Sequence, residues 1–118
     1  MHACMHFVAC VEVIEHLSKL EGEKALGDLK RISRSLLLTT PNRNTWFRVL
    51  SRVIYGAENP DHVSFWKTEE LREEGFVVHG CLGMVTAHRV PKVFWGLWNI
   101  LAWFLPEVFG GDLIALLK

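Results

Sequence analysis

The sequence predicts an α/β domain, and three observations support this prediction. Residues 7–11 and 36–40 are compact runs of apolar and β-branched side chains with the length of buried strands. Between them, apolar residues recur at helical spacing across residues 18–33. Strand, helix and strand in this order form a βαβ unit, whose crossover makes the two strands parallel and brings their carboxyl ends to one edge of the sheet.

The bulk composition narrows the class of protein. A chain of 118 residues is long enough for one domain, and 13 basic side chains balance 13 acidic ones, so any nucleic-acid contact must be local. Cys4, Cys10 and Cys81 are widely spaced and form no Cys-x-x-Cys pair, which argues against a disulfide framework and a thiolate zinc site. No secretory leader is recognisable, so we expect a cytoplasmic protein.

The individual elements are predicted from their boundary residues. Ser18 and Glu21 have the spacing of a capping box and begin the first helix. The second strand stops at Pro41, and a helix over residues 46–54 ends at Gly56, followed by a polar loop over 57–64. A short helix over 68–75, a strand over 76–82 and a last strand over 112–117 complete the expected order.

Residues 93–105 form an aromatic segment between two prolines and contain Trp95, Trp98 and Trp103. A helix needs about 20 apolar residues to cross a bilayer, so we predict no transmembrane span. Two interpretations stay open. The segment is either a lid or core helix, or a peripheral membrane contact, because tryptophan favours the headgroup level.

A cluster of ionisable side chains follows the first strand. Glu12, Glu15 and His16 lie at its predicted carboxyl end, which is where open α/β sheets bind ligands. Two carboxylates and an imidazole are suited to metal binding or acid–base chemistry, although an ordinary solvated turn before a helix has the same composition. Thr40, Pro41 and Asn42 end the next strand and share this edge, either as pocket residues or as a strand end and helix cap.

Four segments together resemble a known family. These are residues 8–17, residues 37–43, residues 61–66 with the following Glu-Glu-Leu and Gly-Phe, and residues 110–117. They resemble the fourth to seventh strands of class I S-adenosylmethionine-dependent methyltransferases, whose seventh strand runs antiparallel to its neighbours. The two most similar branches are the ubiquinone-biosynthesis type of O-methyltransferase and the small-RNA 3′-terminal 2′-O-methyltransferases.

The resemblance implies a partial Rossmann-like fold. Residues 1–118 would form a single incomplete methyltransferase domain, with strands four to seven, their flanking helices and no N-terminal cofactor-binding half. The sequence contains no Gly-x-Gly-x-Gly turn of the kind that contacts the methionine part of S-adenosylmethionine in this family. Cys10, Val11 and Glu12 would contribute part of the cofactor floor, and catalysis would require the rest of the domain.

The second branch also implies a metal site. There, a Glu-x-x-Glu-His motif and a later histidine bind a divalent ion, so the corresponding ligands for Mg²⁺ or Mn²⁺ would be Glu12, Glu15, His16 and His62. His16 and His62 would then be the catalytic residues. The methyl acceptor would be a hydroxyl on an RNA terminus or a small molecule, and Thr40, Pro41 and Asn42 would contact it.

A second class of function fits the same sequence. Without a strand beside residues 7–11, the edge of the sheet would be open, and an open apolar edge promotes association. The alternative is therefore a non-catalytic interaction module that forms a homodimer or binds a partner through this edge and the Trp-rich segment.

Overall fold

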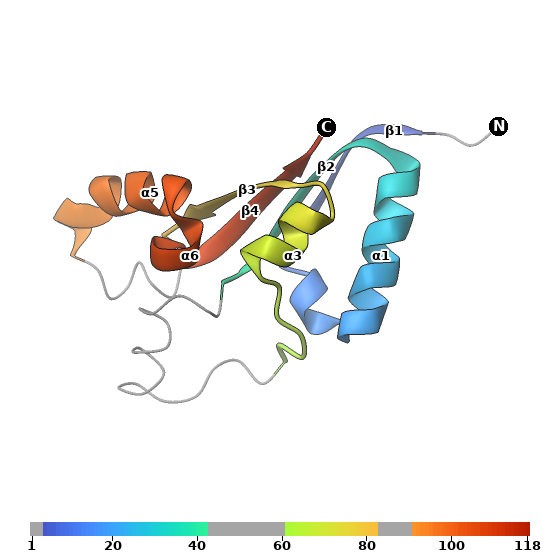
Figure 1. Cartoon of the computed structure of the whole chain (residues 1–118), viewed down its shortest axis with the longest axis horizontal. Helices are drawn as coiled ribbons and strands as arrows, with labels where there is room; N and C mark the ends of the chain where they lie inside the picture. Colours follow the sequence, from blue (N-terminus) through green and yellow to red (C-terminus); the bar gives the residue numbers. More distant parts are fainter. Residues whose placement is uncertain (1–3, 43–60, 83–90) are drawn as a thin grey trace.

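The computed structural model describes residues 4–42, 61–82 and 91–118. Figure 1 shows one mixed sheet with its helices. In chain order the elements are β1 (Met5–Val11), the 3₁₀ turn η1 (Ile14–His16), α1 (Lys19–Ile32), β2 (Ser33–Pro41), α3 (Thr68–Glu73), β3 (Val77–Cys81), the 3₁₀ turn η2 (Lys92–Phe94), α5 (Trp95–Phe104), α6 (Pro106–Phe109) and β4 (Asp112–Leu117).

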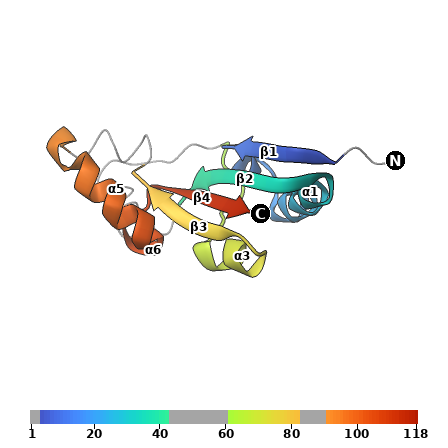
Figure 2. The same ribbon diagram turned by 90° about the horizontal axis from the view of Figure 1, so that it is seen from above.

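The strands form a four-stranded sheet in the order β1-β2-β4-β3, which Figure 2 shows from above. β1 pairs with β2 in parallel, so the predicted βαβ unit is confirmed. β4 lies between β2 and β3 and is antiparallel to both, as expected for the last strand. Consequently β1, β2 and β3 all point the same way, and their carboxyl ends lie at the same edge.

Helix α1 begins where its sequence predicts. The Ser18 side chain accepts a hydrogen bond from the Glu21 N–H, and the Glu21 carboxylate accepts one from the Ser18 N–H, which completes the capping box. The helix continues directly into β2 at Ser33, whose hydroxyl donates to the Leu29 carbonyl at 2.6 Å. This short connection fixes the position of β2 relative to β1.

The hydrophobic core lies on one face of the sheet. Its members come from β2, β3, β4, α1, α3 and the segment before α3, and include Leu26, Leu36, Leu38, Leu71, Val78, Leu113, Ala115 and Trp66. The side chains that alternate along the strands are more exposed, for example Val77 at 60% in β3, and Phe7 at 57% and Val11 at 53% in β1. Helices α1 and α3 therefore cover the same face, and β1 forms an edge of the sheet.

Most predicted elements are confirmed, with small shifts at their ends. β1 and β2 are longer than the apolar runs that predicted them, and β3 is shorter by one residue at each end. The helix predicted over residues 46–54 lies outside the described residues. Within the described part of the chain, no helix is long and apolar enough to cross a membrane.

Candidate functional site

A sharp turn follows β1 at the carboxyl edge of the sheet. Glu12 has a φ of 51°, in the left-handed region that few non-glycine residues adopt. Its N–H donates to the Thr39 carbonyl at 3.1 Å, and the Thr39 hydroxyl donates to the Glu12 carboxylate at 3.0 Å. Unusual backbone conformations of this kind are concentrated at functional sites. Here the turn directs the chain across the end of β2 and into η1.

Glu15, in η1, has the most unusual environment of the predicted site residues. Only 2% of the residue is exposed, and one carboxylate oxygen, Oε2, accepts a hydrogen bond from the Thr40 hydroxyl at 3.2 Å. The other oxygen, Oε1, is buried and has no hydrogen-bond partner among the described residues. A buried polar atom without a partner costs free energy, so this oxygen is available for a ligand.

His16 is oriented by a backbone carbonyl. Its Nδ1 lies 3.0 Å from the Asp61 oxygen, and a carbonyl can only accept, so Nδ1 carries a proton. In the neutral ring Nε2 then holds a lone pair, and this atom lies 3.9 Å from Glu15 Oε1. Histidine ligands of metals are commonly oriented by such a hydrogen bond from the second ring nitrogen.

His62 completes the group although it is distant in the sequence. Its ring meets that of His16 edge-on, with 4.9 Å between the ring centroids. The segment that carries it is held by the Glu15 carbonyl, which accepts hydrogen bonds from the N–H groups of Val63 at 2.8 Å and Ser64 at 3.1 Å. The Ser64 hydroxyl also donates to the Ile14 carbonyl at 3.2 Å.

Glu15, His16 and His62 can therefore act together as a ligand set. One potential ligand atom from each lies within 4.8 Å of the other two. A carboxylate and two imidazoles are a donor set that suits an intermediate divalent cation. The structure brings these three predicted ligands together and leaves Glu12, whose carboxylate is engaged by Thr39, outside the group.

The predicted cofactor residues lie at the end of β1 beside this group. Val11 is 53% exposed, whereas Cys10 is partly buried. Burial, and then the charge of Glu15, raises the pKa of the Cys10 thiol. Cys10 is therefore protonated at neutral pH.

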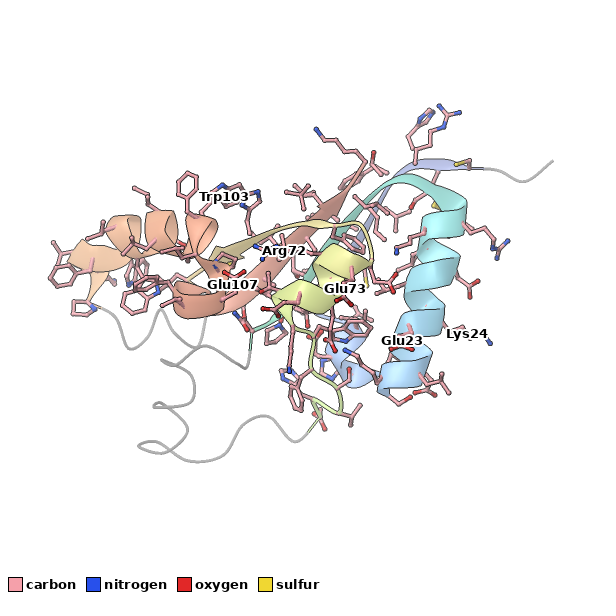
Figure 3. All side chains as sticks on the ribbon, viewed as in Figure 1. Glu23, Lys24, Arg72, Glu73, Trp103 and Glu107 are labelled. Atoms are coloured by element: carbon pink, nitrogen blue, oxygen red, sulfur yellow. The ribbon has the colours of Figure 1, made fainter. Side chains whose placement is uncertain are left out.

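The predicted substrate residues have different environments. Thr40 is buried against Glu15, and Asn42, which is 3% exposed, donates from its side chain to the Pro106 carbonyl at 2.8 Å. Asn42 also lines a polar cavity of about 360 Å³, whose other described lining residues are Lys67, Thr68, Glu69 and Glu107. Figure 3 labels Glu107 beside Arg72 of α3, to which it is hydrogen-bonded.

Sequence reasoning missed several residues that shape the site. Thr40 was predicted at this edge, but its hydrogen bond to Glu15 was not, and Lys67 and Glu69 were not expected beside a cavity. The sequence feature that could have indicated this contact is the predicted position of Thr40 on the same edge of the sheet as Glu15. The hydrogen bond from His16 to the Asp61 carbonyl could not be predicted, because a backbone carbonyl is present at every residue.

Comparisons with known proteins bear on the fold. No protein-family model matches the sequence, and no curated protein sequence matches it. The crystal structure of the small RNA methyltransferase HEN1 is similar at 17% identity with a TM-score of 0.60, over 95% of this chain and 14% of that one. A SAM-dependent methyltransferase from Archaeoglobus fulgidus is similar at 16% identity with a TM-score of 0.56, over 98% of this chain and 59% of that one.

The chain thus spans less than two thirds of either similar structure. The seventh-strand arrangement expected from the sequence is present, since β4 lies antiparallel between β2 and β3. The fold is therefore that of part of a class I S-adenosylmethionine-dependent methyltransferase domain, with a Rossmann-like mixed sheet.

Proposed function

We propose that this chain forms the acceptor side of an S-adenosylmethionine-dependent O-methyltransferase whose active site holds a divalent cation. The observation that carries the proposal is Glu15 Oε1, a buried carboxylate oxygen that has no hydrogen-bond partner among the described residues and lies 3.9 Å from His16 Nε2. Two electron-pair donors that face each other are stabilised by a cation between them, and His62 supplies a third donor.

Glu15, His16 and His62 would hold the ion, and Glu12 would join them as a fourth ligand only after its carboxylate releases the hydrogen bond from Thr39. Such a cation, Mg²⁺ or Mn²⁺, would supply Lewis acidity that orients a hydroxyl group and lowers its pKa. The chain's own contribution is to keep the ligands in place. Thr40 fixes the Glu15 carboxylate, and the Asp61 carbonyl fixes the His16 ring and its tautomer.

The methyl donor would be S-adenosylmethionine, bound in part against Cys10, Val11 and Glu12. Val11 presents an exposed apolar side chain there, and the protonated Cys10 thiol does not compete with the acceptor as a nucleophile. The 118 residues contain no glycine-rich turn for the methionine moiety. In this proposal the remaining contacts to the cofactor would be made by residues outside these 118.

The acceptor would be a hydroxyl on an RNA terminus or a small molecule. The carboxyl ends of the three parallel strands form the edge on which Glu15 and the cavity beside Asn42 both lie. An acceptor extended along this edge would meet the metal ligands at one end and Pro41, Asn42 and the cavity at the other. Its methylated oxygen would be positioned next to Glu15, and most of the rate would come from this positioning.

Thermal unfolding with Mn²⁺ tests the metal site. Ligand that binds only the folded state raises the melting temperature, so wild-type protein should melt at a higher temperature when Mn²⁺ is added. The combined substitutions Glu15→Ala and His62→Ala should abolish this rise. Glu23→Ala, on the surface of α1 (Figure 3), is the matched control and should retain it. An unchanged rise in the double variant would refute the assignment.

Titration calorimetry with S-adenosylmethionine tests the enzyme class separately. If this chain holds part of the cofactor floor, it should bind the cofactor weakly, with more heat when Mn²⁺ and an RNA oligonucleotide bearing a 3′-terminal hydroxyl are present. Val11→Asp should reduce the binding. Heat at the level of buffer dilution under every condition would remove methyl transfer as a function of this chain.

A second candidate function is association through β1. This strand is an edge of the sheet, and its outward side chains include Met5, Phe7 and Val11, each more than half exposed. An edge with these properties pairs readily with another strand, including that of a second copy. Sedimentation velocity at micromolar concentration should then show a homodimer that Phe7→Lys dissociates. A monomer at every concentration would argue against this candidate.

A further inference from the structure

Helix α5 presents an apolar stripe to solvent. Val93, just before the helix, is 83% exposed, Leu97 and Ile100 are each 59% exposed, and Phe104 is 74% exposed. Their spacing of four, three and four residues places these side chains on one face of a helix. The face has no charged or hydrogen-bonding side chain along its length. This is the reverse of a normal surface helix, which turns its apolar face to the core.

The polar side chains of the same helix bond to the protein backbone, although Asn99 itself is exposed. The Asn99 carboxamide accepts a hydrogen bond from the Leu82 N–H at 2.8 Å and donates to the Trp95 carbonyl at 3.0 Å. The indole N–H of Trp98 donates to the Phe109 carbonyl at 2.9 Å, and Ala102 is fully buried. The rotation of the helix is therefore fixed, with its hydrogen-bonding side inward and its stripe outward.

One basic residue, Lys92, lies at the start of the stripe, and the first acidic residue after it in the sequence, Glu107, follows the helix. Lys92 is exposed next to Val93 and Phe94, at the end of the stripe. A cationic group beside exposed apolar side chains is complementary to a surface of anionic headgroups that covers hydrocarbon.

We propose that α5 docks on an anionic lipid surface, with Val93, Leu97, Ile100 and Phe104 among the acyl chains and Lys92 at the headgroups. The helix has 10 residues and lies in the interface plane, because it is too short to span. Figures 1 and 2 both place α5 at the end of the molecule opposite the N-terminus, where it projects beyond the sheet. α5 therefore lies far from α1.

The lipid surface explains the stripe better than a protein partner does. Interfaces between proteins carry hydrogen bonds among their apolar contacts. The four side chains of the stripe are all hydrocarbon and can make none. Trp103, which is 40% exposed on the same helix, also matches the composition of interfacial membrane helices. This surface lies apart from Glu15, so its role does not depend on the metal site.

Vesicle co-sedimentation tests the proposal with the full 118-residue chain. Wild-type protein should sediment with vesicles that mix phosphatidylcholine and phosphatidylglycerol, and much less with phosphatidylcholine alone. Leu97→Glu should lower the partition coefficient at least about ten-fold, since an apolar side chain is replaced by a charge. The matched control is Leu20→Glu on α1, where the leucine is 77% exposed, and it should bind like wild type. Lys92→Glu should lower binding to the anionic vesicles about five-fold.

Three results would overturn the proposal. These are the absence of wild-type sedimentation with anionic vesicles, equal binding to neutral and anionic vesicles, and an equal loss in Leu20→Glu and Leu97→Glu. If Leu97→Glu instead dissociates a protein oligomer and leaves vesicle binding unchanged, the stripe is a protein interface. Leu20 and Leu97 are both exposed, so both variants should fold. Circular dichroism spectra that match that of the wild type will check this.

Discussion

At the scale of residues, the site depends on how one buried carboxylate is held. Thr40 donates to one oxygen of Glu15 and leaves the other without a partner in the described structure. An unpartnered buried acceptor is unfavourable by roughly 1–3 kcal/mol, and folded proteins rarely keep one without a use. The Thr40 hydroxyl is therefore a positioning group that acts through Glu15.

Replacement of Thr40 tests this role. Thr40→Val keeps the shape of the side chain and removes its hydrogen bond, so Mn²⁺ affinity should fall by roughly 10- to 100-fold. Thr40→Ser retains the hydroxyl and should restore most of the affinity. Titration calorimetry of both variants gives the comparison. If valine and serine weaken Mn²⁺ binding equally, the residue fills space and does not orient the carboxylate.

The sequence predicted which residues lie together at this site. It predicted only some of the contacts between them. Glu12, Glu15 and His16 follow directly after β1 in the sequence, so their common position was predictable from the end of that strand. His62 was predicted only from the family resemblance, because its approach depends on two backbone hydrogen bonds to the Glu15 carbonyl. The partner of Thr40 depends on the β1–β2 register, which aligns Val11 with Thr39 and leaves no trace in residue periodicity.

At the scale of elements, α1 is fitted closely against the segment before α3. A Cβ added at Gly22 would lie 2.6 Å from Trp66 Cζ2, and the Trp66 ring is buried beneath the charge of Lys19. The absence of a side chain at Gly22 therefore allows α1 to pack closely against Trp66, which belongs to the same segment as His62. Gly27, on the same helix, has nothing within 4 Å of its added Cβ.

The two glycines provide a matched pair of substitutions. Gly22→Ala should destabilise the protein by about 1–3 kcal/mol, because the new methyl group displaces a buried ring. Gly27→Ala should stabilise it by roughly 0.5–1 kcal/mol through higher helix propensity. Urea unfolding measures both. Equal stability of the two variants would show that Trp66 does not pack against Gly22.

The capping box of α1 predicts a pH dependence. Hydrogen bonds from the Ser18 hydroxyl and the Ser18 N–H lower the pKa of Glu21 in the folded protein. A carboxyl group with a lowered folded pKa stabilises the fold above its unfolded pKa of about 4.3. This contribution is lost as the pH falls through the folded pKa. The difference in Tm between wild type and Ser18→Ala should therefore narrow as the pH falls from about 7 to about 3.

Ser33 at the other end of α1 provides the control for this measurement. Its hydroxyl donates to the Leu29 carbonyl, which does not titrate. The Tm difference between wild type and Ser33→Ala should thus be independent of the ionisation of Glu21. If the two serine variants show the same dependence on pH, the carboxylate of Glu21 is not part of the cap.

At the scale of the whole molecule, the fold class and the order of elements were predictable, and the exact sheet was only partly so. The βαβ unit follows from two apolar runs and the helix between them, since parallel pairing requires a crossover. The antiparallel direction of β4 followed from the family resemblance alone, and its position between β2 and β3 was not predicted. The reversed orientation of α5 could not be predicted, because its uniformly apolar sequence does not show which side faces solvent.

The open side of the sheet also becomes clear only at this scale. α1 and α3 cover one face, and exposed Phe7 and Val11 lie on the other, along an edge strand. This chain aligns with 14% and 59% of the two similar structures. The proposed metal ligands all lie in this chain, so their binding of Mn²⁺ can be measured on the chain by itself.

Titration calorimetry with Mn²⁺ at neutral pH tests the central claim most directly. Wild-type protein should bind one ion per chain, and Glu15→Gln, which keeps the shape of the side chain and removes its charge, should bind at least about 100-fold more weakly. Glu23→Gln changes the same charge on the surface of α1 and should bind like wild type. No saturable binding by the wild type, or equal affinity in wild type and Glu15→Gln, would contradict the account.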